Sequence, residues 1–168
     1  MTRKLFLALA TLLLTIGFSS AAAYADSISF TLNNPNQFGS QYVLLTYTAT
    51  VTAPISNGAA VYLNGDSFNV AAPVTLDDTD FFLNSPFFLN PGDSFTFDIF
   101  TLSLPHGIPV GVTYFGSFSI LGGGNGGSGD VLGSQNFSVT ATPEPSSFML
   151  LGTGVTGLVA FVRRRRSV

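Results

Sequence analysis

The densest group of side chains that could do chemistry is the run Asp77-Asp78-Thr79-Asp80. Clustered carboxylates on a loop are hard oxygen ligands, and Ca²⁺ takes about six to eight oxygens of this kind. The run lacks the glycine and the glutamate that an EF-hand loop places at fixed positions. A calcium site at Asp77, Asp78 and Asp80 is therefore one interpretation, and a solvated turn before Phe81-Phe82 is the other.

Other catalytic residue types are sparse. His106 is the only histidine, there is no cysteine, and no Gly-x-Ser-x-Gly nucleophile motif is present. A zinc site is not expected with one histidine and no cysteine. A Ser-His-Asp triad would have to use His106, but no nucleophile elbow accompanies it. A glycosidase needs two carboxylates at a defined separation, and eight aspartates supply pairs without specifying one. We expect that the protein is not an enzyme, with a secreted hydrolase as a remote alternative.

A glycine-rich run extends from Gly122 to Asp130. It is not a phosphate-binding loop, because no Lys-Ser/Thr pair follows it and no helix is expected after it. It is not a calcium-binding nonapeptide repeat either, because there is no second copy. The composition favours a flexible hairpin loop.

The C-terminal tail has three parts in a fixed order. Pro143-Glu144-Pro145 is followed by an apolar run from Ser146 to Val162, and then by the basic residues Arg163, Arg164, Arg165 and Arg166. As a helix the apolar run would be roughly 25 Å long, at the short end for a membrane span. The positive-inside rule would place the arginines in the cytoplasm and the rest of the chain outside. We therefore expect a C-terminal transmembrane helix.

These same residues resemble the PEP-CTERM sorting signal of exopolysaccharide-producing Gram-negative bacteria. The resemblance covers about the last 26 residues, including Leu150-Leu151-Gly152-Thr153-Gly154. It implies an inner-membrane-anchored precursor, removal of the tail by exosortase, and display at the cell surface or in the extracellular matrix. It implies nothing about what the delivered domain does.

The N-terminus has the form of a secretory signal. Arg3 and Lys4 precede an apolar stretch, and Ala23-Tyr24-Ala25 is a small-x-small cleavage site. We expect a signal peptide at residues 1–25, an ectodomain at 26–141 and a sorting tail at 142–168. Signal peptidase would cut between Ala25 and Asp26.

The expected ectodomain is strongly acidic. It holds eight aspartates and no Glu, Lys or Arg, so its net charge is near −8 although the whole chain carries −3. Such a domain has no basic surface for nucleic acid and can form no Lys or Arg salt bridge within itself. It also has no disulfide, so it depends on its apolar core.

Alternation of apolar and polar residues predicts an all-β fold. The pattern has period two in Tyr42 to Val51, Phe95 to Ile99 and Val112 to Ile120, and no stretch has a helical period. Asn64-Gly65 is a candidate type I′ hairpin turn. Frequent turn signals predict an antiparallel sandwich of about seven to nine strands, between a signal helix and a C-terminal helix.

Two segments of the ectodomain are similar to the last strands of Ig-like domains in bacterial surface proteins. They are Leu89 to Phe95, with its Pro-Gly turn, and Pro109 to Gly116, with its Gly-x-Thr-Tyr sequence. The resemblance implies an Ig-like sandwich and no particular function.

Two functions suit this sequence. The first is a structural or interaction protein of the exopolysaccharide envelope or biofilm. The second is a calcium-assisted carbohydrate-binding module that uses exposed rings from Phe81-Phe82, Phe87-Phe88 and Phe115. The alternative for these rings is that a second sheet covers both faces of their strands.

Overall fold

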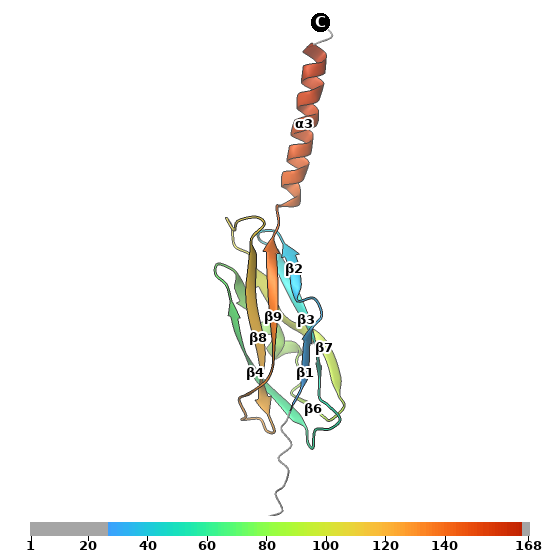
Figure 1. Cartoon of the computed structure of the whole chain (residues 1–168), viewed down its shortest axis with the longest axis vertical. Coiled ribbons are helices and arrows are strands. Elements are labelled where there is room, and N and C mark those ends of the chain that lie inside the picture. The colour runs from blue at the N-terminus through green and yellow to red at the C-terminus, as the bar shows by residue number, and fades with distance from the viewer. Residues whose placement is uncertain (1–26, 166–168) are drawn as a thin grey trace, which may run out of the picture.

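The computed structural model describes residues 27–165, which form an elongated β-sandwich followed by one long helix (Figure 1). The expectation of an all-β domain is confirmed, with nine strands in the part of the chain that is described. The expected signal peptide, its expected cleavage site between Ala25 and Asp26, and Arg166 lie outside the described residues.

The sandwich has two sheets. In spatial order, the four-stranded sheet contains β1 (Ser29–Leu32), β3 (Leu44–Thr52), β7 (Ser94–Ser103) and β5 (Thr75–Asp77). The five-stranded sheet contains β2 (Asn36–Gly39), β9 (Asp130–Ala141), β8 (Thr113–Gly123), β4 (Val61–Val70) and β6 (Phe88–Leu89).

One strand pair departs from the expected antiparallel arrangement. β2 pairs with β9 in parallel, whereas the other strand pairs in the described residues are antiparallel. The cause is the break at Asn34-Pro35, where the chain passes from one sheet to the other without reversing direction. Pro35 cannot donate to a strand ladder, but its carbonyl oxygen accepts a 2.8 Å hydrogen bond from Ser138 N.

The alternation of apolar and polar residues correctly predicts which face of β3 is buried. Tyr47, Ala49 and Val51 have no exposed surface, and the threonines between them face outward. The outward threonines form hydrogen bonds across the sheet, including Thr48 Oγ1 to Asp98 Oδ1 at 2.8 Å. β3 is therefore a half-buried strand with one apolar and one polar face.

The core is built from stacked aromatic rings. Phe118 of β8 lies 5.0 Å from Phe100 of β7, and Phe100 lies 4.7 Å from Tyr47, between ring centroids. Tyr47 also donates its hydroxyl to Ser138 O at 2.8 Å, which joins the two sheets. Burial of this hydroxyl raises the pKa of Tyr47 to about 12.

Two local predictions are wrong. Asn64-Gly65 is not a hairpin turn, because β4 runs through it from Val61 to Val70 with a bulge between Leu63 and Gly65. The expectation of no helix in the domain also fails, because residues Thr79–Asn84 form the short helix α2. Phe81 of α2 inserts into the core and is 1% exposed.

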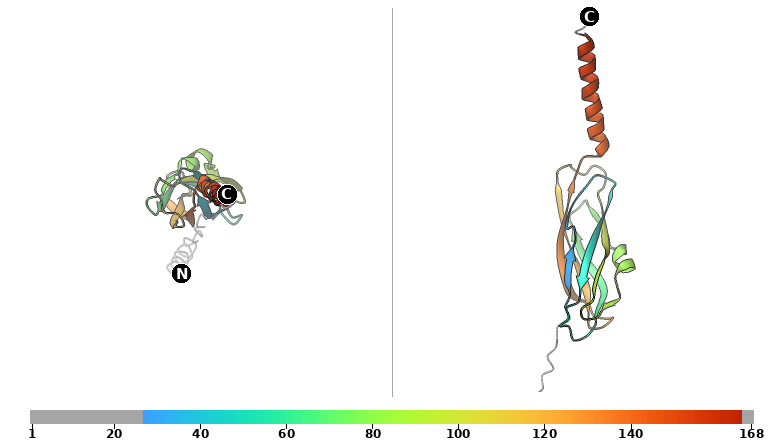
Figure 2. Two further views of the ribbon diagram at one scale, coloured as in Figure 1. Left: turned by 90° about the horizontal axis from the view of Figure 1, so that it is seen from above. Right: turned by 90° about the vertical axis from the view of Figure 1, so that its right-hand side faces the viewer.

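The C-terminal helix, α3, extends from Pro145 to Arg165. Figure 2 shows it leaving one end of the sandwich, with α2 on the outer side of the strands. Among residues 27–165, no helix is long and apolar enough to cross a membrane. The predicted helix is thus present, but its prediction as a transmembrane span is not supported by this finding.

Candidate functional site

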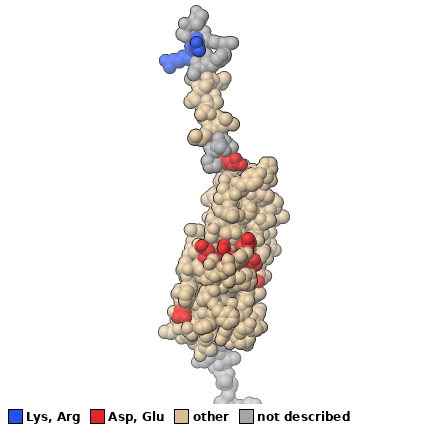
Figure 3. Space-filling model, turned by 180° about the vertical axis from the view of Figure 1, so that it is seen from behind, with Lys and Arg blue, Asp and Glu red and all other residues tan. Residues whose placement is uncertain are grey.

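On the face shown in Figure 3, acidic side chains gather across the middle of the sandwich. The run predicted as a calcium loop lies where β5 ends and α2 begins. Asp77 Oδ1 accepts hydrogen bonds from Thr79 N at 3.0 Å and from Thr79 Oγ1 at 2.6 Å. These bonds, first from the side chain and then from the backbone, lower the pKa of Asp77. Asp77 therefore serves as a local turn residue.

The other two predicted ligands belong to the start of α2. The carbonyl oxygen of Asp78 accepts from Phe81 N at 2.9 Å, and Asp80 lies in the first helical turn. Across residues 27–165, no three His, Cys, Asp or Glu side chains are grouped so that they could hold a metal ion. The geometry thus gives the calcium hypothesis no support, because Asp77, Asp78 and Asp80 form the turn that begins α2 and are not grouped around one point.

Asp66, which the sequence pattern does not single out, has an unusual environment. Asp66 lies opposite Ile120 in the β4–β8 ladder, so its side chain shares the inward face of the sheet with a fully buried residue. Its Oδ2 atom is buried and has no hydrogen-bond partner among the described residues. Burial, and then the negative charge of Asp78, raise the pKa of Asp66 to about 6.

A pocket of about 360 Å³ lies beside the β4 bulge. We call it the Asn64 pocket; it is lined by Leu63, Asn64, Phe81, Phe82, Ser85, Phe87 and Gly126. The rings of Phe82 and Phe87 are 61% and 67% exposed. The edge-to-face contact of Phe87 with Tyr62, at 5.6 Å and 90°, fixes the orientation of the Phe87 ring.

Asn64 connects this pocket to the glycine-rich loop. Its Nδ2 atom donates to Asn125 O and to Ser128 O, each at 2.8 Å, so one side chain holds both halves of the loop. Its Oδ1 atom is buried and has no hydrogen-bond partner within the described part of the chain. Asn64 thus lines the pocket while its Oδ1 atom is buried, and no charged side chain lines the pocket.

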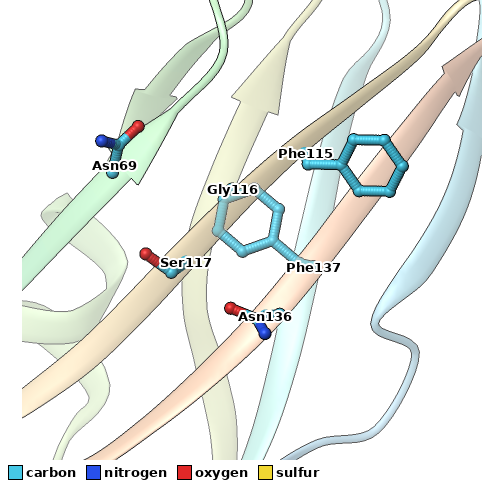
Figure 4. Close-up of a pocket in the computed structure, with 6 residues that line it drawn as sticks. All are labelled: Asn69, Phe115, Gly116, Ser117, Asn136 and Phe137. Atoms are coloured by element: carbon cyan, nitrogen blue, oxygen red, sulfur yellow. The ribbon is translucent and has the colours of Figure 1, made fainter.

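A shallower groove of about 410 Å³ lies on the five-stranded sheet (Figure 4). Asn69, Ser117 and Asn136 come from adjacent strands in register, and the ring of Phe115 lies beside them. Phe115 is 68% exposed. The groove is also uncharged, but its polar side chains are not among the buried atoms that lack a partner.

The remaining predicted site residues lie apart from both pockets. His106 is exposed in the turn after β7, and its ring lies 5.8 Å from that of Tyr42. Glu144 is exposed at the root of α3, and Arg163 and Arg164 are exposed near its other end. The tail residues are thus arranged along the chain and do not converge in space.

Comparison with known families identifies this linear arrangement. Residues 141–166 match the family model of the PEP-CTERM protein-sorting motif. The match includes Pro143, Glu144 and Pro145 and the basic residues from Arg163 to Arg166. No curated protein matches the chain. The motif supports an exported protein with a membrane-anchored precursor and exosortase as its processing partner: the tail of this chain is a PEP-CTERM sorting motif.

Proposed function

We propose that this protein is a structural or interaction component of the exopolysaccharide envelope or biofilm of a Gram-negative bacterium. Its ectodomain would be a non-catalytic, Ig-like sandwich, exported through its signal peptide and released or displayed after exosortase removes the tail. The observation that carries this proposal is the sorting motif at residues 141–166.

The chemistry of α3 supports a tail that enters the membrane in the precursor. Thr153 Oγ1 donates to Met149 O at 2.9 Å, and Thr156 Oγ1 donates to Gly152 O at 2.9 Å. These two hydroxyls are satisfied within the helix, so neither needs water. The basic cluster that begins at Arg163 would hold this end of the helix on the cytoplasmic side.

The first prediction separates the two ends of the tail. Replacing Pro143, Glu144 and Pro145 together with alanine should leave membrane insertion intact and abolish tail removal, since insertion depends on the apolar helix. Replacing the arginines at 163–166 with glutamine should instead weaken retention and orientation in the membrane, because the basic residues set the topology. Mass spectrometry of the membrane and extracellular fractions measures both effects.

The wild-type chain is the reference for this experiment. We expect its extracellular form to begin at Asp26 and to lack the arginine cluster. Extracellular peptides that end at Val168 would contradict processing, even if the precursor is anchored. Identical behaviour of the two variants would contradict the division of roles within the tail.

The Asn64 pocket favours a second candidate function, carbohydrate binding without calcium. A pyranose sugar combines hydroxyl donors with an apolar face that stacks on aromatic rings. Asn64 and Ser85 line the pocket and bring polar side chains to it, with no charged side chain beside them. Phe82 and Phe87 supply exposed rings at the same pocket.

The second prediction tests this candidate with two rings of nearly equal exposure. Phe87→Ser should weaken binding to the producer's polysaccharide about tenfold, as expected for a loss of about 1.4 kcal/mol. Phe115→Ser, in the groove of Figure 4, is the matched control, because Phe115 is 68% exposed and Phe87 is 67% exposed. Equilibrium binding of both variants is the measurement. Equal affinity of Phe87→Ser and wild type would reject the pocket as the sugar site.

A further inference from the structure

Six exposed apolar side chains lie on the loops and strand ends at the end of the sandwich from which α3 leaves. We call this the tail-end surface; its members are Phe38, Tyr42, Val43, Leu44, Val110 and Val112. Phe38 lies opposite Thr140, and Leu44 lies opposite Ser103, so both lie where β2 and β9 end and β3 begins. Exposed apolar side chains that are brought to one end of a domain are candidates for an interaction site.

The same end holds the root of the tail. Gly111 N donates to Ala141 O at 2.8 Å, Ala141 N donates to Val112 O at 3.0 Å, and Thr142 N donates to Gly39 O at 2.8 Å. Only residues 143 and 144 then separate Thr142 from the start of α3. A link this short spans at most about 10 Å, so the tail-end surface must face whatever α3 enters.

Tyr42 is presented in a strained conformation. Its φ of 65° makes it the only positive-φ residue other than glycine in the described chain. The backbone is held there by Tyr42 N donating to Leu104 O at 3.1 Å, and the neighbouring Gln41 Oε1 accepts from Gly107 N at 3.1 Å. The ring is nevertheless 67% exposed. A strained residue that points into solvent indicates a functional position, because nothing in the core requires it.

The segments that form this end carry no formal charge. Residues 36–44 and 104–113 contain no Asp, Glu, Lys or Arg. In the face shown in Figure 3, the acidic side chains lie around the middle and toward the far end of the sandwich, with one at the root of the helix. An acidic domain that approaches an anionic bilayer is repelled least through an uncharged end.

We propose that the tail-end surface contacts the headgroup and upper acyl region of the lipid bilayer while the precursor is anchored. The proposal rests on the proposed function, because it requires α3 to enter the membrane. Tyrosine combines an apolar ring with a polar hydroxyl and is enriched at membrane interfaces. Aliphatic neighbours such as Leu44 and Val110 add apolar area that is favourable to bury in lipid.

The sequence makes a clean fluorescence test possible, because the chain contains no tryptophan. Tyr42→Trp places a single reporter on the tail-end surface, and Val110→Trp places a second one at a position without a positive φ. Phe87→Trp is the matched control at the Asn64 pocket, since Phe87 and Tyr42 are both 67% exposed. Each full-length variant is reconstituted into phosphatidylcholine–phosphatidylglycerol vesicles with and without brominated acyl chains.

We expect the fluorescence of Tyr42→Trp and Val110→Trp to shift to shorter wavelength in vesicles and to lose intensity with brominated lipid, while Phe87→Trp shows neither change. Unquenched reporters at positions 42 and 110, with a tail protected from added protease, would overturn lipid contact and leave anchoring intact. Failure of all variants to associate with vesicles would overturn both. A wavelength shift that follows protein concentration, without quenching by brominated lipid, would assign the surface to a second copy and overturn the proposal.

Discussion

Phe118→Ala is expected to destabilise the domain by about 3–5 kcal/mol, the usual cost of removing a buried phenylalanine ring. Phe118 is fully buried and contacts rings from the opposite sheet and from α2: its centroid lies 5.0 Å from that of Phe100, 6.4 Å from that of Phe30 and 6.1 Å from that of Phe81. No side chain can fill the resulting cavity without leaving its own contacts. A loss of this size is a large part of the roughly 5–15 kcal/mol that stabilises a domain.

Phe115→Ala is the control for this prediction. Phe115 lies three residues earlier on the same strand, but its side chain is 68% exposed, so its replacement should cost about 0.5 kcal/mol or less. Urea unfolding of the exported protein measures both variants. Equal midpoints for the two variants would contradict the arrangement of the core.

The second large effect is the pH dependence that Asp66 confers. Its pKa is raised from 3.8 to about 6 in the folded protein, by burial and by the charge of Asp78. The folded state therefore binds this proton more tightly than the unfolded state. The contribution of Asp66 to stability is most favourable below about pH 4, and it is lost as the pH rises toward 6.

Asp66→Asn should remove this loss and stabilise the protein at pH 7. A shift of this size corresponds to about 3 kcal/mol if fully expressed, and partial exposure of the carboxyl reduces the expected gain to about 1–2 kcal/mol. Below pH 4 the variant and the wild type should be nearly equal. Urea midpoints measured from pH 3.5 to 8 give the comparison.

Asp130→Asn controls for the change in net charge, because it removes a carboxylate from an exposed position at the start of β9. If Asp130→Asn stabilised the protein at pH 7 as much as Asp66→Asn does, general charge repulsion would explain the effect, and the buried environment of Asp66 would not.

Much of the fold could be predicted because strand burial is recorded in local alternation. Tyr47, Ala49 and Val51 alternate with threonines, and the structure buries the apolar set as expected. Phe95 shows the limit of this signal, since it shares the pattern of Phe97 and Ile99 but is 47% exposed near the start of β7. Alternation identifies a face, whereas burial also depends on how far the opposite sheet extends.

The Asn64-Gly65 error and the missed Asp66 have the same cause. Counting from the buried residues Val61 and Leu63, strict alternation places Gly65 inward and Asp66 outward. The bulge between Leu63 and Gly65 inserts one residue and reverses this order, so Asp66 lies opposite the buried Ile120. A dipeptide typical of tight turns does not reveal that the chain will instead continue as a bulged strand.

The helix α2 was missed because six residues are too few to show a helical period. Its single buried residue, Phe81, is positioned by packing against Phe118 from a strand far along the chain. The sorting motif, in contrast, could be predicted from the sequence alone. It is read as a linear signal, so residues 141–166 suffice to recognise it without knowledge of the fold.

The positions of the two ends of the sandwich have a mechanical consequence. The chain enters near β1 at one end and leaves through β9 at the other, so tension between a tethered tail and a bound matrix would act along the strands (Figure 1). β9 is held by ten paired residues on β8 and by four on β2. Because ladder hydrogen bonds run across the strands, such a force loads them together in shear instead of opening them one at a time. Because β2 pairs with its outer edge, β9 is held on both edges, and the last strand before the tail resists a pulling force through two neighbouring strands.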